Sequence, residues 1–216
     1  MYIGRIVSVA QTPSGRLCAM YRVSSRSFPN RTARLGENKV SIVPKEGFET
    51  DVHKNPYIAY NCVRVMCDGQ VAVVTNGSQT DPIAEKIALG LPPRDALAWS
   101  SLALDFEKDD YNTPRVSAVV DKRDGSGWLA IVRQDGLEVR KMPLAPGKFF
   151  YIATYEEHFI QDAQGGNFTG ETSEEACRFI LGEDVFARRT NPVTAVCAVA
   201  GETGFDLCTL DVKKDA

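Results

Sequence analysis

Three arginines and three serines lie within residues 21–31, directly after an apolar run that predicts a buried strand. The planar guanidinium of arginine matches two oxygens of a phosphate at once, and serine hydroxyls and free backbone N–H groups can complete such a shell. We therefore expect an anion site for a phosphorylated small molecule. The alternative is a solvated basic turn. The candidate ligands are Arg22, Ser24, Ser25, Arg26 and Arg31.

A second polar segment, residues 105–115, crowds four carboxylates at the end of a helix predicted over residues 94–109. The negative end of a helix dipole disfavours acids, so at least one of them is expected to have another use. A solvated helix end is the alternative, and it explains Asp109 and Asp110 well. Asn112 and Arg115 then carry hydrogen-bonding groups into the next strand. The four acids are Asp105, Glu107, Asp109 and Asp110.

Residues 55–62 hold further polar groups within a predicted strand. Alternation places Asn61 on one face, with Tyr60 and Cys62 on the other. A buried asparagine must find hydrogen-bond partners, so Asn61 is either functional or structural, and Tyr60 is either functional or a core tyrosine. We expect Cys62 to be an inert buried thiol, because no histidine lies near it in the sequence.

The loop of Asn76, Gly77 and Ser78 joins a predicted strand to a predicted helix. Backbone N–H groups in that setting often contact anions or ring carbonyls. A simple connecting loop is an equally good interpretation of this short segment.

The composition indicates one ordinary domain over residues 1–216, with 44% hydrophobic residues and a net charge of -3. This charge argues against a general nucleic-acid binder, and no apolar run is long enough to span a bilayer. Without an apolar secretory segment at the start, a cytoplasmic location is expected. The six cysteines and two histidines lack the spacing of a metal site, and disulfides are not expected.

Apolar patterns and turn residues predict mostly strands with few helices. The order of these elements, a block of strands, a pair of helices and more strands, favours an α+β fold with segregated layers, in which two antiparallel sheets carry helices outside. A Thr172–Glu175 capping box is predicted to open the last helix, and residues 213–216 are expected to fray. The expected strands cover residues 3–10, 17–24, 39–43, 57–66, 71–75, 116–120, 128–132, 137–141, 149–155, 193–200 and 205–210, and the expected helices residues 81–90, 94–109 and 173–181.

Taken together, these segments resemble the archaeal-type inosine monophosphate (IMP) cyclohydrolases. The resemblance runs through residues 4–7, 21–31, 55–61, 75–78, 105–108 and 112–115, and it is strongest over residues 1–120. It implies a four-layer αββα fold like that of the N-terminal-nucleophile hydrolases. Those hydrolases expose a Cys, Ser or Thr at a processed N-terminus, whereas this chain begins Met1-Tyr2. A covalent acyl mechanism is therefore not expected.

The resemblance also implies a reaction. Members of the family close 5-formamidoimidazole-4-carboxamide ribonucleotide (FAICAR) to IMP with loss of water, the last step of de novo purine synthesis, and need no metal or organic cofactor. An amide nitrogen is a poor nucleophile, so the reaction needs a folded substrate, a donor to the developing oxyanion and a proton for the leaving hydroxyl. The expected oxyanion donors are Tyr60, Asn61 and Asn76.

For the acid/base we expect Glu107, with Asp105 as the alternative carboxylate and Tyr60 as its partner. Asn112 and Arg115 are expected to position the substrate, and the amides of Asn76, Gly77 and Ser78 to contact it. A homo-oligomer is expected as well. Two other functions remain open: an amidohydrolase that uses Cys62 or a serine, and a nucleotide-binding module without catalysis.

Overall fold

The computed structural model describes residues 1–212, which form two sheets with helices on their outer faces. All strand pairings in the described chain are antiparallel. The first sheet has six strands in the order β11-β10-β1-β2-β12-β13. They are β1 (Ile6–Gln11), β2 (Leu17–Ser24), β10 (Lys148–Ala153), β11 (Gly165–Asn167), β12 (Pro192–Ala200) and β13 (Phe205–Asp211).

The second sheet has seven strands, and each pairs with its neighbour in the sequence, in the order β3-β4-β5-β6-β7-β8-β9. Most of the links are short turns, and the β6–β7 link carries two helices. The strands are β3 (Arg31–Leu35), β4 (Lys39–Pro44), β5 (Tyr60–Met66), β6 (Val71–Thr75), β7 (Arg115–Asp121), β8 (Ser126–Arg133) and β9 (Gly136–Met142).

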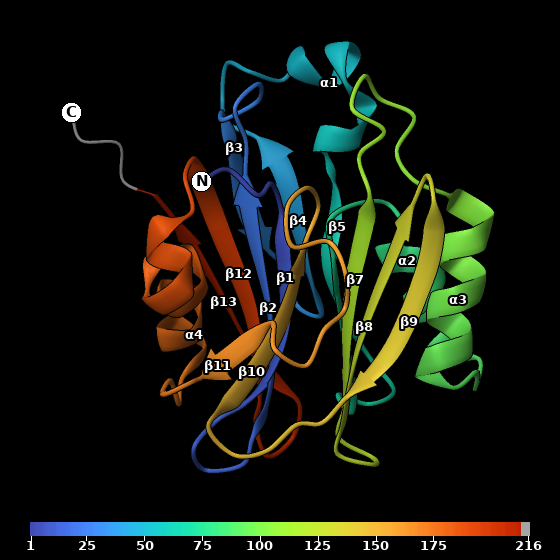
Figure 1. Ribbon diagram of the computed structural model, residues 1–216, viewed down its shortest axis with the longest axis vertical. Helices are drawn as coiled ribbons and strands as arrows, with labels where there is room; N and C mark the ends of the chain where they lie inside the picture. Colours follow the sequence, from blue (N-terminus) through green and yellow to red (C-terminus); the bar gives the residue numbers. More distant parts are fainter. Residues whose placement is uncertain (213–216) are drawn as a thin grey trace.

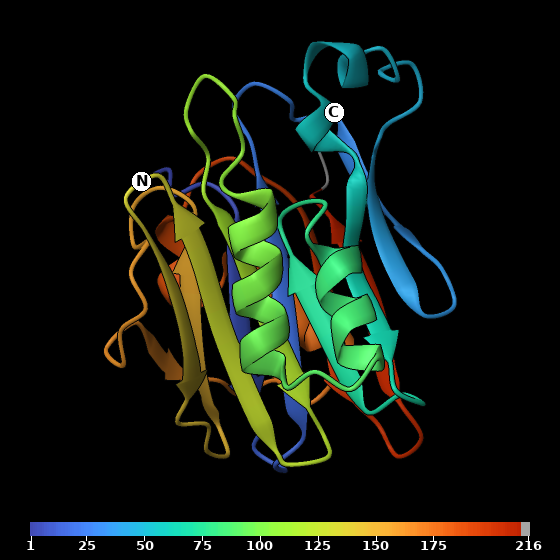
Figure 2. The ribbon, with the colours of Figure 1, turned by 90° about the vertical axis from the view of Figure 1, so that its right-hand side faces the viewer.

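Helices cover the outer face of each sheet (Figure 1). Helix α4 (Ser173–Gly182) lies on the six-stranded sheet, and α2 (Thr80–Ala88) and α3 (Pro93–Leu104) lie side by side on the seven-stranded sheet (Figure 2). Three short elements complete the described chain: α1 (Asp51–Lys54), the 3-10 helix η1 (Pro56–Ile58) and the 3-10 helix η2 (Asp184–Arg188). The predicted α+β class with two antiparallel sheets is confirmed.

Three apolar clusters hold these layers together. The largest lies between the sheets and includes Tyr21 and Val74. A second, with Met20 and Phe179, fills the space between the six-stranded sheet and α4, and a third lies beneath α2 and α3. All eight residues of β2 are buried, because alternate side chains of this strand enter the first and second clusters.

The end of α3 corrects one prediction. The helix ends at Leu104, five residues before the predicted end at Asp109. Asp105 takes a φ of 56°, a left-handed conformation that an α-helix cannot continue through. Glu107 therefore lies in the loop before β7, and its backbone N–H donates to the Thr113 carbonyl at 2.8 Å. The prediction that the four acids crowd the end of a helix was therefore wrong, and all four lie in the loop between α3 and β7.

Other predictions agree with the structure at the level of elements. The β5–β6 hairpin turns through residues 67–69, all three with positive φ, and the Thr172 capping box is formed. The strand predicted over residues 57–66 begins only at Tyr60, because η1 precedes it. Pattern reasoning missed β3 and β11, and the predicted fraying of residues 213–216 lies outside the described residues.

Candidate functional site

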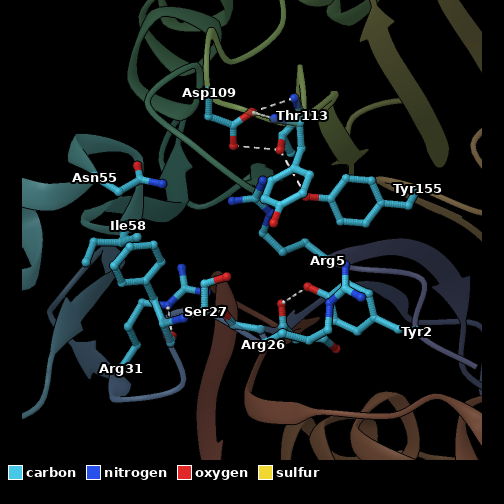
Figure 3. A pocket seen from close by; sticks show the side chains of 14 residues that line it. Tyr2, Arg5, Arg26, Ser27, Arg31, Asn55, Ile58, Asp109, Thr113 and Tyr155 are labelled. Atoms are coloured by element: carbon cyan, nitrogen blue, oxygen red, sulfur yellow. Dashed lines mark hydrogen bonds between the residues drawn. The ribbon is translucent and has the colours of Figure 1, made fainter.

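A pocket opens where several strands of the two sheets begin or end, and Figure 3 shows the side chains that line it. The segment after β2 supplies one wall, the loop before β7 supplies another, and residues next to β1, β10 and η1 complete it. The lining residues are Tyr2, Arg5, Ser24, Ser25, Arg26, Ser27, Phe28, Arg31, Asn55, Ile58, Asp109, Tyr111, Thr113 and Tyr155.

Two of the predicted anion-binding arginines line this pocket. Arg26 is exposed and lies 4.3 Å above the ring centre of Tyr2, which supports its side chain. Arg31 is only 2% exposed. Its Nε donates to the Phe28 carbonyl, while its Nη1 is buried without a hydrogen-bond partner among the described residues. A buried guanidinium nitrogen with an unused donor is a strong candidate for binding an anion.

The neighbouring serines line the same pocket and shape the loop. Ser25 Oγ accepts the backbone N–H of Phe28 at 3.0 Å, and the Ser25 N–H donates to the Asn191 carbonyl. Ser24 Oγ accepts from Arg22 Nε at 3.0 Å. Both hydroxyls keep hydrogen-bonding capacity for a ligand, because a hydroxyl can donate as well as accept.

The structure does not bring Arg22 to the pocket. Its side chain is fully buried and points to the outer face of the six-stranded sheet. There the guanidinium donates to the carbonyls of Phe186, at 3.2 Å, and of Arg189, at 2.5 Å. Burial, followed by the charge of Arg189, lowers the pKa of Arg22 to about 10. Arg22 therefore ties the end of β2 to η2.

Glu107 lies behind the pocket wall in an interior cluster with two arginines. It is fully buried, and its Oε2 accepts from Arg5 Nη2 at 2.9 Å. Its Oε1 lies 3.7 Å from Arg115 Nη1 and has no hydrogen-bond partner among the described residues. Burial raises the pKa of Glu107 and outweighs the opposite pull of Arg5 and Arg115.

The two arginines are fixed by the surrounding backbone. Gly4 has a φ of 77°, and a Cβ there would lie 2.0 Å from Thr154 Oγ1, so only glycine lets the chain lead Arg5 into this position. Arg115, the first residue of β7, donates to the Asp105 carbonyl at 2.8 Å and to Gln79 Oε1 at 3.2 Å. Burial lowers the pKa of Arg115, although Glu107 opposes the shift.

The loop after β6 supports this cluster from behind. A Cβ on Gly77 would lie 2.7 Å from Arg115 Nη1 and 3.2 Å from Glu107 Oε1, so the loop approaches because residue 77 has no side chain. Asn76 is buried, and its amide bonds to Pro114 O and Val116 N. Ser78 is exposed and does not line the pocket. The structure thus places the loop at the site, with Asn76 fully engaged in holding it.

Tyr60 and Asn61 point to opposite faces of β5, as predicted. The Tyr60 hydroxyl lies 2.5 Å from that of Tyr21, between the sheets, and burial raises the pKa of both phenols. Asn61 bonds to Ser41 and Asp81 near α2, away from the pocket. Asn112 is exposed and bonds to Gln134. The structure therefore separates Asn61 and Asn112 from the interior cluster.

Comparisons with known proteins show the family of this chain. The sequence matches the family model described as IMP cyclohydrolase-like protein over residues 2–204. The chain belongs to this family. Curated relatives named IMP cyclohydrolase include a protein of Methanosphaera stadtmanae, 45% identical over 198 residues, which covers 92% of this chain and 94% of the relative. Another, from Methanococcus maripaludis strain C6, is 47% identical over 211 residues, 97% of this chain and 100% of the relative.

The same relationship extends to a more distant member of the family. The IMP cyclohydrolase of Methanocaldococcus jannaschii is 41% identical over 210 residues, which cover 97% of this chain and 98% of the relative. In this IMP cyclohydrolase-like chain, the described residues contain no group of three or more His, Cys, Asp or Glu arranged to hold a metal. No helix among them is long and apolar enough to cross a membrane.

The sequence analysis assigned no role to several residues of this chain that the structure places at the site. Arg5 both lines the pocket and pairs with Glu107, yet it stands 102 positions away from that acid in the chain. Thr113 and Tyr155, whose hydroxyls lie 3.0 Å apart, were likewise assigned no role. Arg5 and Thr113 stand in segments that carry the resemblance, and all three residues lie within two positions of a strand end, but neither signal assigns them a role.

Proposed function

We propose that this protein is an IMP cyclohydrolase, which closes the ring of FAICAR to form IMP and one water. The observation that carries the proposal is the buried Glu107–Arg5 pair directly behind a pocket lined by further arginines and serines. The full-length similarity to proteins named IMP cyclohydrolase supports the same reaction. A binding module has no need of a buried acid with a raised pKa, whereas ring closure with loss of water needs a proton donor.

The arginine and serine segment is proposed to hold the substrate phosphate. Arg26 and the unpartnered Nη1 of Arg31 supply charged donors, and Ser24 and Ser25 supply hydroxyls. A hydrogen bond to a charged group contributes roughly 1.5–3 kcal/mol. We leave Arg22 outside this group, because its guanidinium is already occupied by backbone carbonyls.

Ring closure is proposed to take place next to the side chains of Arg5 and Glu107. The carboxamide nitrogen attacks the formyl carbon, and one proton of this nitrogen passes to the formyl oxygen, which becomes a hydroxyl. The hydroxyl then leaves as water with a proton from Glu107, while the former formamide nitrogen forms the new C=N bond and gives up its own proton, which restores the acid. Tyr60 is the proposed donor to the developing oxyanion. Its raised pKa keeps its proton, and the Tyr21 hydroxyl can donate to Tyr60 and leave that proton free, whereas Asn61 and Asn76 are engaged elsewhere. Contacts to catalytic groups often shorten only when substrate binds, so a place just behind the pocket wall suits Glu107.

Glu107 is the proposed acid for the departing hydroxyl. Its raised pKa favours the protonated form, and Oε2 accepts from Arg5, so the acidic proton belongs on Oε1. Arg115 and Gly77 are proposed to hold this oxygen in place. General acid catalysis of this kind contributes roughly 10²–10⁴-fold to a rate.

The proposal extends to fold family, location and assembly. The order of layers, α4, two sheets, then α2 and α3, supports a likeness to the N-terminal-nucleophile hydrolases. We also propose a cytoplasmic homo-oligomer, for which the exposed Trp99 and Leu102 on α3 offer apolar surface. Light scattering on the purified protein tests the assembly, and a monomer would contradict it.

An absorbance assay tests the reaction. Purified protein is added to FAICAR without metal or cofactor, and the ultraviolet spectrum is followed. We expect the spectrum of IMP to appear. An unchanged spectrum from folded protein that IMP still stabilises against heat would contradict the proposal and leave a binding module.

The amidohydrolase alternative is weaker in the structure. Cys62 is fully buried, its Sγ donates to the Val40 carbonyl, and burial raises its pKa, so the thiolate is disfavoured. Insensitivity of the activity to thiol reagents is therefore expected, and complete loss on modification of Cys62 would favour this alternative.

A further inference from the structure

Three side chains form a continuous hydrogen-bonded chain along the pocket wall that lies across from Arg26 and Arg31 (Figure 3). The Thr113 hydroxyl lies 2.7 Å from Asp109 Oδ2 and 3.0 Å from the Tyr155 hydroxyl. The proposed reaction gives this chain no role.

The direction of the hydrogen bonds that join Asp109, Thr113 and Tyr155 follows from the contacts of Asp109. Asp109 Oδ1 accepts the backbone N–H groups of Tyr111, at 3.2 Å, and Thr113, at 2.9 Å, which favours a carboxylate that only accepts. The single hydroxyl proton of Thr113 is thus directed to Asp109 Oδ2. Because Thr113 is fully buried, no solvent competes for it. The Tyr155 hydroxyl must therefore donate to Thr113.

This direction leaves the Tyr155 oxygen with only lone pairs to offer the pocket. Burial raises the pKa of Tyr155, so its proton stays in place at neutral pH. The hydroxyl of a tyrosine normally donates or accepts as its ligand requires. Here it is restricted to accepting, which allows discrimination between ligands that present a donor and ligands that present an acceptor at this point.

We infer that Tyr155 is a specificity-determining residue that accepts a hydrogen bond from an O–H or N–H group of the bound nucleotide, with Asp109 and Thr113 fixing its polarity. The inference rests on the proposed function, because the nucleotide is the ligand. The donor is a ribose hydroxyl or an N–H of the base portion, and both present the same chemistry to the Tyr155 oxygen.

Two substitutions test the two parts of the inference. Tyr155→Phe removes the acceptor and should raise KM for FAICAR roughly two- to tenfold, as expected for one net hydrogen bond. Asp109→Asn places an amide N–H₂ opposite Thr113, which reverses the chain and makes Tyr155 a donor that faces the nucleotide's donor. We expect a larger loss in kcat/KM, roughly 10- to 100-fold, because a buried donor is then left unpaired.

Tyr151→Phe is the matched control. It also removes a phenol hydroxyl, but that hydroxyl donates to Glu157 at 2.9 Å and does not line the pocket. Kinetics of this variant should equal those of the wild type. Thermal midpoints of all variants show whether they fold, and wild-type kinetics in folded Tyr155→Phe would overturn the inference.

A double variant tests whether Asp109 contributes to nucleotide recognition through Tyr155 or only holds the loop that contains Glu107. If Asp109 acts through Tyr155, Asp109→Asn should cost little more in the Tyr155→Phe background. An equal cost in both backgrounds would mean that Asp109 merely holds the loop, and the assigned polarity would be wrong.

Binding of IMP and its 2′-deoxy and 3′-deoxy forms, measured by calorimetry, identifies the donor. If Tyr155 accepts from a ribose hydroxyl, removing that hydroxyl should abolish the affinity difference between wild type and Tyr155→Phe. A difference that persists with both analogues assigns the donor to the base. Because this readout needs no turnover, an inactive wild type that still shows the difference would contradict the proposed function alone, while equal affinities throughout would contradict the inference.

Discussion

The pocket places two kinds of arginine side by side, and their surroundings differ. At the mouth, formed by the segment after β2, Arg26 is exposed, and Arg31, although buried, keeps an unused donor. In the interior, Arg5 and Arg115 are almost fully buried around Glu107. An arginine without a carboxylate partner can bind an incoming anion, whereas a buried arginine beside a buried acid interacts strongly with that acid and influences its pKa. The mouth is suited to binding and releasing an anion, and the interior to controlling a proton.

This difference predicts which measured quantity each region controls. Substitutions at the mouth should change nucleotide affinity, and substitutions in the interior should change the chemical step. A further arginine, Arg22, belongs to neither region and should affect stability alone.

The largest effect is expected from Glu107→Gln. The amide keeps the shape of the side chain but cannot supply the proton, so kcat should fall by roughly 10²–10⁴-fold while IMP still binds. Steady-state kinetics with FAICAR and calorimetry with IMP check the two parts. Asp105→Asn is the matched control, because Asp105 is the neighbouring exposed acid and pairs with Lys108. Near-normal turnover in Glu107→Gln would show that the interior cluster takes no part in the chemical step.

Arg31→Gln should give the next largest effect. Loss of one charged donor to a phosphate corresponds to roughly 1.5–3 kcal/mol, or about a 10- to 150-fold weaker binding of IMP, with a smaller change in kcat. Calorimetry and kinetics measure the split. Arg34→Gln, an exposed position further along β3, is the control. A fall in kcat without a change in affinity would move Arg31 from the mouth to the reacting atoms.

Arg22→Met should affect stability without affecting the site. The substitution leaves the carbonyls of Phe186 and Arg189 without their donor in a buried place, which costs about 1–3 kcal/mol of unfolding free energy. Urea denaturation should show this loss, while the affinity for IMP stays at the wild-type value. A large loss of affinity in folded protein would return Arg22 to the anion site.

The position of Arg22 also shows what the sequence could and could not predict. The pattern of residues 17–24 predicts a buried strand, and the structure confirms it. Alternation shows that Arg22 shares a face with Cys18 and Met20. Nothing local shows which face meets α4 and which meets the second sheet, because that depends on packing against elements that lie further along the chain.

The interior cluster illustrates the same limit. Glu107 was identifiable as an acid in an unusual place, even though the reason given for it, a helix end, was wrong. Its partner Arg5 could not be paired with it, because the contact joins the residue before β1 to the loop before β7, which are distant in sequence. Asp109 and Thr113, four residues apart, form a local hydrogen-bonded turn that polar spacing alone does not distinguish from a solvated loop.

The smallest effect expected is the pH dependence of stability that Glu107 contributes. Its pKa in the folded protein is raised by burial, above the usual value of about 4.3 for the unfolded chain. A raised pKa means that the folded state binds the proton more tightly. The stability that this provides is fully present below about pH 4.3 and is lost as the pH rises through the folded pKa.

Glu107→Gln cannot titrate at this position and so serves as the reference. The unfolding free energy of the wild type minus that of the variant should fall as the pH rises above about 4.3, by at most about 1.4 kcal/mol per pH unit. Urea denaturation across this pH range measures the difference. A difference that instead rises with pH would mean that Arg5 and Arg115 outweigh burial and hold Glu107 as an anion. The interior would then stabilise charge in the same way as the mouth, and the proton for the departing hydroxyl would have to come from Tyr60.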